Sequence, residues 1–351
     1  MRVAVDSSDL AETASSYEWG SWRDLLTRVP SEFPEIELIE IDAGSASPSP
    51  WGRLRLEQLD LPREAERSGA DLLFVPSVSP PLRSQVPVLA AGWPAAAPRQ
   101  GAIERVRWSA GQAGLRAAKA WLVFADGAPA GLRARVVPPG VATAFRGVPS
   151  GDDASIRSRL GLPEVYVLSL APPSERTEFG LASWTWVDGS VGESIPWVIA
   201  GMPAGEAESL LARARKLDVA ESVRLTPLPS LQDLPAVYRG AQAYLHLGGG
   251  GTEQILRWAL ATGIPVASVD SERAAAVLGE GAYIVPDDDS RALGAACLTL
   301  LVEPEVADSL RRNGLQRAAA YHGPEPTRAL RDILVEFGSQ RSARPIQGES
   351  S

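Results

Sequence analysis

A run of four glycines at positions 248–251 is the part of this chain best suited by residue type to hold an anion. Glycine carries no Cβ, so a ligand can approach the backbone closely there. Thr252 is a good helix N-cap, and a helix N-terminus directs N–H groups and positive partial charge toward a phosphate. A tight strand-to-helix turn without a ligand is the alternative. The amides that we expect to bind phosphate are those of Gly249, Gly250, Gly251 and Thr252.

Composition argues against several other kinds of chemistry. The formal net charge of −9 disfavours non-specific nucleic-acid binding. The single cysteine, Cys297, excludes a disulfide framework, and no His, Cys, Asp or Glu spacing is typical of a metal site. The first residues lack the features of a signal peptide, and no apolar stretch reaches the ~18–20 residues that cross a bilayer. We therefore expect a cytoplasmic protein.

The glycine turn needs a strand before it and a helix after it, and this alternation runs along the whole chain. Short apolar runs predict strands at 3–6, 36–41, 72–75, 86–91, 122–125 and 135–137, then at 165–170, 197–200, 223–225, 243–247, 265–269 and 283–285. Helical patterns lie between them, at 19–28, 54–68, 103–119, 178–187, 204–216, 231–239, 252–261 and 291–302. Such alternation predicts an α/β fold whose parallel sheets are covered on both faces.

The two halves predict two Rossmann-like domains that face each other across a cleft. We expect an N-terminal domain at 1–145, a C-terminal domain at 146–325, a helix at 326–337 that crosses back to the first domain, and a disordered tail at 338–351. Ligands of open parallel sheets bind beyond the carboxyl ends of the strands. The cleft is therefore the expected site, and the glycine turn would open onto it.

Seven segments of the chain occur in an order typical of one family. Among them are RVVPPG at 135–140, WVIAG at 197–201 and ALATGIPV at 259–266. They are similar to the hinge strand, the "L-x-I-x-G" strand and the "A-M-A-x-G-x-P-V" segment of GT-B glycosyltransferases. The resemblance is greatest to glycosyltransferase family 4 (glycosyl transferases group 1) and covers about residues 120–335. It implies the GT-B fold and a nucleotide sugar as the donor substrate.

The resemblance fails at the residues with which that family handles its donor. Two family glutamates, one near the donor sugar and one holding the ribose, correspond to Gly250 and Trp258 here. The family's Arg and Lys that neutralise the diphosphate correspond to Pro172 and Thr177. These absences leave open whether the chain is an enzyme.

Four side chains near the turn are candidates to replace what is missing. The planar guanidinium of Arg176 could bind phosphate oxygens at two points, or it could be a solvated loop arginine. Glu253 could contact the donor sugar, although the helix dipole alone favours a glutamate in a first helical turn. His246 could donate to a bound nucleotide or be a buried neutral histidine. Trp258 could cover the ribose position, stack on a base or pack in the core.

The resemblance implies retaining, metal-independent transfer of a sugar from a nucleotide sugar to a glycan, lipid or polymer acceptor, with no further cofactor. The alternative is an inactive pseudo-glycosyltransferase that binds a nucleotide, a glycan or a protein partner. The helix at 103–119 carries four cationic side chains, which would allow peripheral contact with a membrane. A solvated helix face is the commoner meaning of that many charges.

Overall fold

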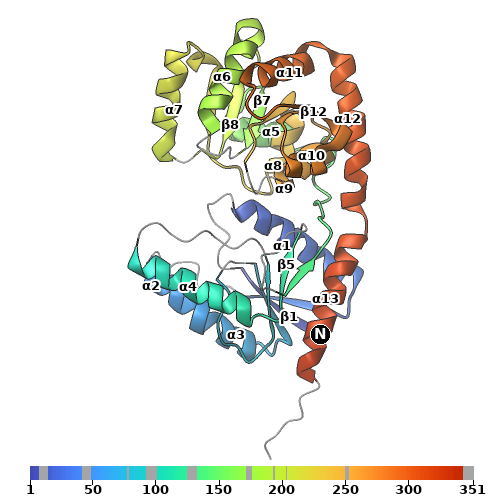
Figure 1. Ribbon diagram of the computed structural model, residues 1–351. Helices are drawn as coiled ribbons and strands as arrows, with labels where there is room; N and C mark the ends of the chain where they lie inside the picture. The colour runs from blue at the N-terminus through green and yellow to red at the C-terminus, as the bar shows by residue number, and fades with distance from the viewer. Residues whose placement is uncertain are drawn as a thin grey trace, which may run out of the picture. The chain divides into compact units, whose positions relative to one another are not determined.

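The chain folds into two compact units. One consists of Met1–Gly140 together with Gly323–Ser351, and the other of Val141–His322. A computed structural model describes residues 1–7, 15–41, 49–76, 79–91, 101–124, 133–170, 176–192, 194–202, 204–249 and 253–342. Each unit is built around a six-stranded sheet in which every pair of neighbouring strands is parallel (Figure 1).

The sheet of the first unit has the strand order β2-β1-β3-β4-β5-β6. Its strands are β1 Arg2–Asp6, β2 Glu37–Ile41, β3 Leu72–Val75, β4 Val88–Ala91, β5 Ala120–Val123 and β6 Ala134–Val136. Successive residues point to opposite faces, so Leu72 and Phe74 enter one core while Leu73 and Val75 enter the other. Both faces are buried, which explains why these strands are continuous apolar runs.

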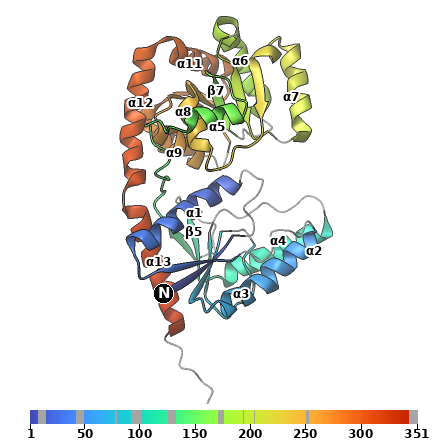
Figure 2. The ribbon, with the colours of Figure 1, turned by 180° about the vertical axis from the view of Figure 1, so that it is seen from behind.

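Helices cover both faces of this first sheet. α1 (Ser15–Glu32) and α13 (Glu325–Ser342) share one core with the sheet. α3 (Leu61–Arg67) and α4 (Ala102–Ala117) supply the other core, and α2 (Pro50–Arg55) lies beside α4 (Figure 2). A π-helical turn, η1 (Leu56–Asp60), joins α2 to α3.

The C-terminal helix is longer than the sequence indicates. It continues through Gly338 to Ser342, so the predicted disordered tail at 338–351 was wrong for its first five residues. A Cβ added to Gly338 would clash with the side chain of Met1, so the close approach of Met1 to the helix needs glycine there. The Ser339 hydroxyl also donates to the carbonyl of Val335 at 2.7 Å, within the helix. Residues 343–351 lie outside the described residues.

The first boundary between the units also differs from the expected 145/146. Residues 141–145 belong to the second unit. The N–H of Val141 donates to the carbonyl of Tyr321 at 3.2 Å. The ring of Phe145 stacks on Trp258, with ring centres 4.7 Å apart and planes 5° apart. These contacts attach the segment to the second core rather than the first.

The sheet of the second unit has the order β12-β11-β10-β7-β8-β9. Its strands are β7 Val167–Leu170, β8 Trp197–Ala200, β9 Val223–Thr226, β10 Ala243–His246, β11 Val266–Val269 and β12 Ala282–Val285. From β7 the chain builds outward in one direction to β9, then returns to the other side of β7 with β10. The point between β7 and β10 is therefore a topological switch point, where open α/β sheets bind ligands beyond the strand ends.

Helices cover both faces of the second sheet as well. One core contains α6 (Thr177–Val187), α7 (Ala204–Lys216) and α11 (Ser290–Val302), including the buried Cys297. The opposite face holds α8 (Leu234–Gly240) and α9 (Glu253–Thr262), where Tyr238 stacks on Tyr244 of β10. The remaining helices of this unit are α5 Asp153–Arg159, α10 Glu272–Leu278 and α12 Pro304–Ala318.

The fold class predicted from the alternating pattern is confirmed. In the described residues, a strand is found at each of the twelve predicted places. None of the helices in that part of the chain has both the length and the apolar character needed to span a membrane.

Candidate functional site

The described start of the glycine turn lies at the switch point of the second sheet. Gly248 and Gly249 follow β10 with φ of 88° and 105°, a region of backbone conformation that favours glycine. A Cβ added to Gly248 would lie 2.9 Å from the Val269 side chain, so the fold itself requires glycine there. The other predicted phosphate-binding amides, those of Gly250, Gly251 and Thr252, lie outside the described residues.

Arg176 is fixed against this turn. It immediately precedes α6, and its Nε donates to the carbonyl of Leu247 at 2.7 Å. Its Nη2 donates to both the carbonyl and the Oδ1 of Asp287, each at 2.8 Å. The guanidinium also lies over the Phe179 ring, 4.2 Å from its centre. The structure therefore brings Arg176 to the predicted site, where two of its three nitrogens bind the protein itself.

Asp287 is a residue of this site that the sequence reading missed. It lies two residues before Asp289, which caps α11 by accepting from the N–H of Ala292 at 2.8 Å. Asp287 instead turns toward Arg176. It follows β12, whose carboxyl end lies at the same sheet edge as the glycine turn. That strand-end position was the signal available in the sequence.

His246 is a buried histidine in β10. Its Nδ1 lies 2.8 Å from the hydroxyl of Ser268, which donates to the carbonyl of Val269 at 2.8 Å. That geometry fits a neutral imidazole whose proton is on Nδ1. Burial, and then the nearby charge of Arg176, lower the pKa of His246 to about 4. The ring is uncharged at neutral pH.

Glu253 and Trp258, both on α9, point to neighbours inside the second unit. The Oε1 of Glu253 lies 3.2 Å from Nη1 of Arg273 on α10, and the glutamate side chain is 15% exposed. Trp258 is buried in the core, where it stacks on Phe145. Glu253 lies in the first turn of α9, where the helix dipole favours an acid, and Trp258 has the core-packing position that was the last of its alternatives.

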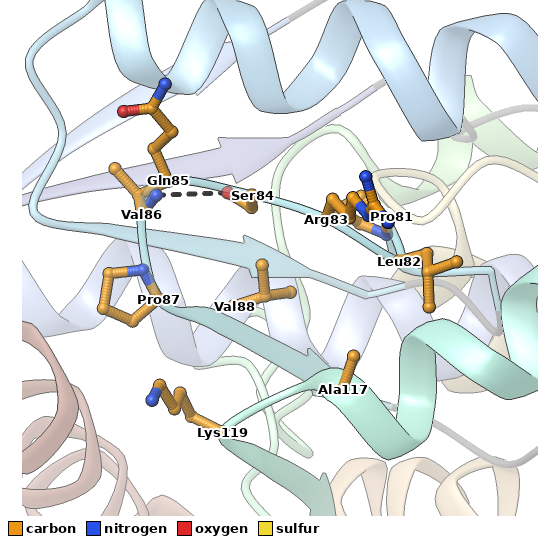
Figure 3. Close-up of a pocket in the computed structure, with 10 residues that line it drawn as sticks. All are labelled: Pro81, Leu82, Arg83, Ser84, Gln85, Val86, Pro87, Val88, Ala117 and Lys119. Atoms are coloured by element: carbon orange, nitrogen blue, oxygen red, sulfur yellow. Dashed lines mark hydrogen bonds between the residues drawn. The ribbon is translucent and has the colours of Figure 1, made fainter.

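A pocket of about 530 Å³ lies elsewhere, at the amino ends of β4 and β5 in the first unit. In Figure 3 the loop of Arg83, Ser84 and Gln85 forms one side of it, with Ala117 and Lys119 opposite and Val88 between. Lys119 closely follows the C-terminal end of α4, where the helix dipole favours a cation without any ligand. The pocket is at the opposite edge from the strand ends that form sites in such sheets.

Among the described residues, no group of three or more His, Cys, Asp and Glu side chains could hold a metal ion. The candidate site thus consists of the turn after β10, Arg176 and Asp287. His246 is the buried last residue of β10, two positions before Gly248. Backbone amides and one partly exposed guanidinium are groups that bind anions.

Comparison with known proteins identifies the fold. No protein-family model and no curated protein sequence matches the chain. Among solved structures, HepE of Anabaena, in complex with UDP and glucose, matches with a TM-score of 0.68 and 11% identity, over 97% of this chain and 100% of HepE. WaaG, a glycosyltransferase involved in lipopolysaccharide biosynthesis, matches with a TM-score of 0.67 and 14% identity, over 94% and 99% of the two chains.

The chain therefore has the GT-B fold of glycosyltransferases, as its segment order predicted. The same fold occurs in a UDP-N-acetylglucosamine 2-epimerase, which matches with a TM-score of 0.58 and 13% identity over 100% of this chain and 99% of its own. One fold thus carries more than one reaction, and the reaction of this chain must be argued from its site.

Proposed function

We propose that this chain binds a nucleotide sugar at the carboxyl edge of its second sheet and transfers the sugar to an acceptor. The observation that carries the proposal is the turn at Gly248 and Gly249, which leaves β10 at the switch point in a glycine-dependent conformation. HepE, which has the same fold, was crystallised with UDP and with UDP-glucose. Both observations support a nucleoside diphosphate as the common part of the ligand.

In the proposed complex the diphosphate lies against the backbone amides of Gly249, Gly250, Gly251 and Thr252. The Nη1 of Arg176 is the guanidinium nitrogen that, among the described residues, has no protein partner, and it would add a charged donor. A helix N-terminus stabilises an anion by roughly 0.3–1 kcal/mol when exposed and by up to ~2 kcal/mol when partly buried. These groups would stabilise charge that develops on the leaving diphosphate.

The rest of the proposal follows the family resemblance. It comprises a retaining, metal-independent reaction without a further cofactor, a glycan, lipid-linked or polymer acceptor and a cytoplasmic location. Each of these is an expectation for experiment.

A second candidate function is binding without transfer. It is favoured by the fate of the side chains that could do chemistry. Glu253 is paired with Arg273, and Trp258 is packed in the core. Two nitrogens of Arg176 are bound to Leu247 and Asp287. A protein with these contacts could hold a nucleotide or a glycan while the Glu253 carboxylate stays with Arg273 instead of the donor sugar.

One set of measurements tests both functions. We expect a UDP-, GDP- or ADP-sugar to raise the thermal unfolding temperature, since ligand at about 100 times its Kd adds roughly 2.7 kcal/mol of stability. Arg176→Ala should weaken this binding about tenfold. Arg291→Ala, which removes an arginine that lies over the Trp186 ring, should not. Release of nucleoside diphosphate from the bound donor would establish transfer or hydrolysis; binding without release would support the second function. No shift with any nucleotide sugar would reject sugar transfer and would reject a nucleotide as the ligand of the second function.

A further inference from the structure

The contacts of Arg176 connect strand ends that are not neighbours. Its Nε binds the carbonyl of Leu247 after β10, and its Nη2 binds Asp287 after β12. β11 lies between these two strands in the sheet. One guanidinium therefore spans the edge of three strands at the place where the glycine turn begins.

The Arg176–Asp287 pair packs directly against the turn. A Cβ built on Gly248 would lie 3.4 Å from Oδ1 of Asp287 and 3.7 Å from Nε of Arg176. The ring of Phe179 supports the guanidinium on one face. The arginine side chain is 22% exposed and the Asp287 side chain is 60% exposed, so the carboxylate reaches from the solvent side to a guanidinium that the protein already holds. A rotation of the peptide groups at the start of the turn would have to break the bond to Leu247 or displace the carboxylate.

We propose that Asp287 is a positioning residue of the nucleotide site. Its carboxylate holds the Arg176 guanidinium, and the guanidinium in turn holds the carbonyl of Leu247, so the amides of residues 247–249 keep one orientation. This inference rests on the proposed function for its ligand. The pair of side chains holds the turn in the ligand-free protein as well.

Asp287 has two effects on an anionic ligand, and they have opposite signs. By fixing Arg176 it preorganises the turn, which favours binding. By adding negative charge beside the guanidinium it opposes a diphosphate. Asparagine separates these effects, because Asp287→Asn keeps the Oδ1 acceptor and removes the charge. Asp287→Ala removes both.

The first test is calorimetric binding of UDP to the full chain and to three variants. Positioning predicts that Asp287→Asn binds UDP at least as tightly as the unaltered protein and at least fivefold more tightly than Asp287→Ala. Asp288→Ala is the matched control, because it removes a neighbouring charge without touching Arg176, and it should not weaken binding. If Asp287→Ala binds UDP as tightly as Asp287→Asn, the carboxylate merely competes for the arginine and the proposal is wrong.

The second test does not need a nucleotide. Hydrogen exchange in the ligand-free protein should be about tenfold faster at the amides of residues 247–249 in Asp287→Ala than in Asp287→Asn or Asp288→Ala. Equal exchange in all three variants would overturn the proposal. If the unaltered protein binds no nucleotide but this difference is found, the proposed function fails while the positioning role stands.

Discussion

At the scale of single residues, the side chains that could do chemistry are mostly bound by the protein. Residue types and spacing located the turn, because a glycine run between a strand and a helix pattern is a local signal. They did not reveal that Arg176 meets Asp287. Those two residues come from segments 111 positions apart, and only the strand order brings them together. The contacts of His246 with Ser268 and of Trp258 with Phe145 could not be predicted from the sequence for the same reason.

His246 gives a prediction about pH. Its pKa is lowered to about 4 in the folded protein, against an ordinary value of 6.5. Between those values the unfolded chain binds a proton that the folded chain does not, so stability is complete above about pH 6.5 and falls as the pH falls. At pH 5 the loss from this group is about 2 kcal/mol. Urea unfolding at pH 7.5 and pH 5 measures it.

The matched variant is His246→Gln, which can still bond to Ser268 but does not titrate. Asp24 contributes a change of opposite sign, since burial raises its pKa to about 6, but it contributes equally to both proteins. The decrease in unfolding free energy between the two pH values should therefore be about 2 kcal/mol larger in the unaltered protein. An equal decrease would show that the imidazole is protonated in the folded state.

At the scale of elements, buried parallel strands were predictable because each is a continuous apolar run. Among the helices that the sequence analysis did not predict are α5 and α12. The buried residues of α12 are all small: Ala307, Gly314 and Ala318. The helix therefore has no stripe of large apolar side chains. In α5 the buried residue is an acid, Asp153. Helices held by small residues or by an ion pair lack the apolar period on which such predictions depend.

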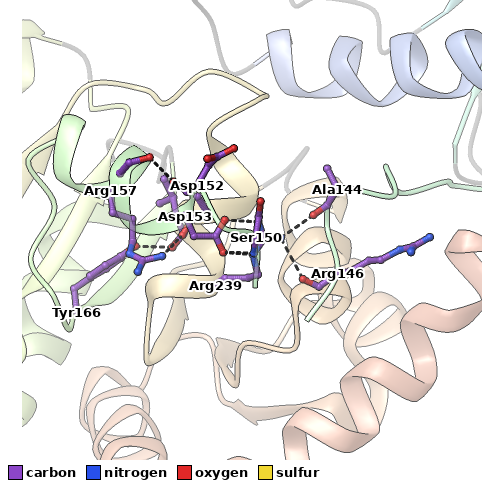
Figure 4. Close-up of polar contacts among 11 residues, drawn as sticks. Ala144, Arg146, Ser150, Asp152, Asp153, Arg157, Tyr166 and Arg239 are labelled. Atoms are coloured by element: carbon purple, nitrogen blue, oxygen red, sulfur yellow. Dashed lines mark hydrogen bonds and ion pairs between the residues drawn. The ribbon is translucent and has the colours of Figure 1, made fainter. Parts of the chain in front are cut away.

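The ion pair that holds α5 can be tested. Arg239 of α8 makes two bonds of 2.7 Å to the Asp153 carboxylate, and the side chains are 9% and 7% exposed. Its Nη1 also donates to the carbonyls of Ala144 and Arg146, which fixes the segment leading into the second unit (Figure 4). Arg239→Ala leaves a buried carboxylate unpaired, so it should lower the free energy of unfolding by about 3–5 kcal/mol.

Arg159 provides the control for this prediction. From α5 it pairs with Asp233, the residue just before α8, at the same distance of 2.7 Å, but the arginine is 61% exposed. Arg159→Ala should therefore lower the free energy of unfolding by less than about 1 kcal/mol. Denaturant unfolding of both variants compares a buried and an exposed ion pair of equal length. Similar decreases in the free energy of unfolding would mean that burial does not decide the strength of these pairs.

At the scale of the whole molecule, the first unit is assembled from both ends of the chain. The C-terminal helix α13 completes its core with the buried residues Leu330, Ile333, Leu334 and Phe337. Gly140 lies against both Leu25 of α1 and Pro326 of α13, so the two segments of the unit meet where the chain leaves and re-enters it. The order of segments in the sequence predicted the fold. It did not predict this division of the core, which depends on contacts between residues some 300 positions apart.

This division predicts how fragments of the chain behave. Removing four large core side chains at about 2–5 kcal/mol each costs about 8–20 kcal/mol together, which is as much as the 5–15 kcal/mol by which domains are usually stable. A fragment of residues 1–140 should therefore show no cooperative thermal transition by circular dichroism. The same fragment joined to residues 323–342 through a short Gly-Ser linker should recover a cooperative transition. The linker can be short because Gly140 lies against Pro326, near the start of the added piece. Residues 141–322, which contain both layers of the second unit, should unfold cooperatively by themselves. A cooperative transition in residues 1–140 alone would mean that α13 covers a core that is already stable.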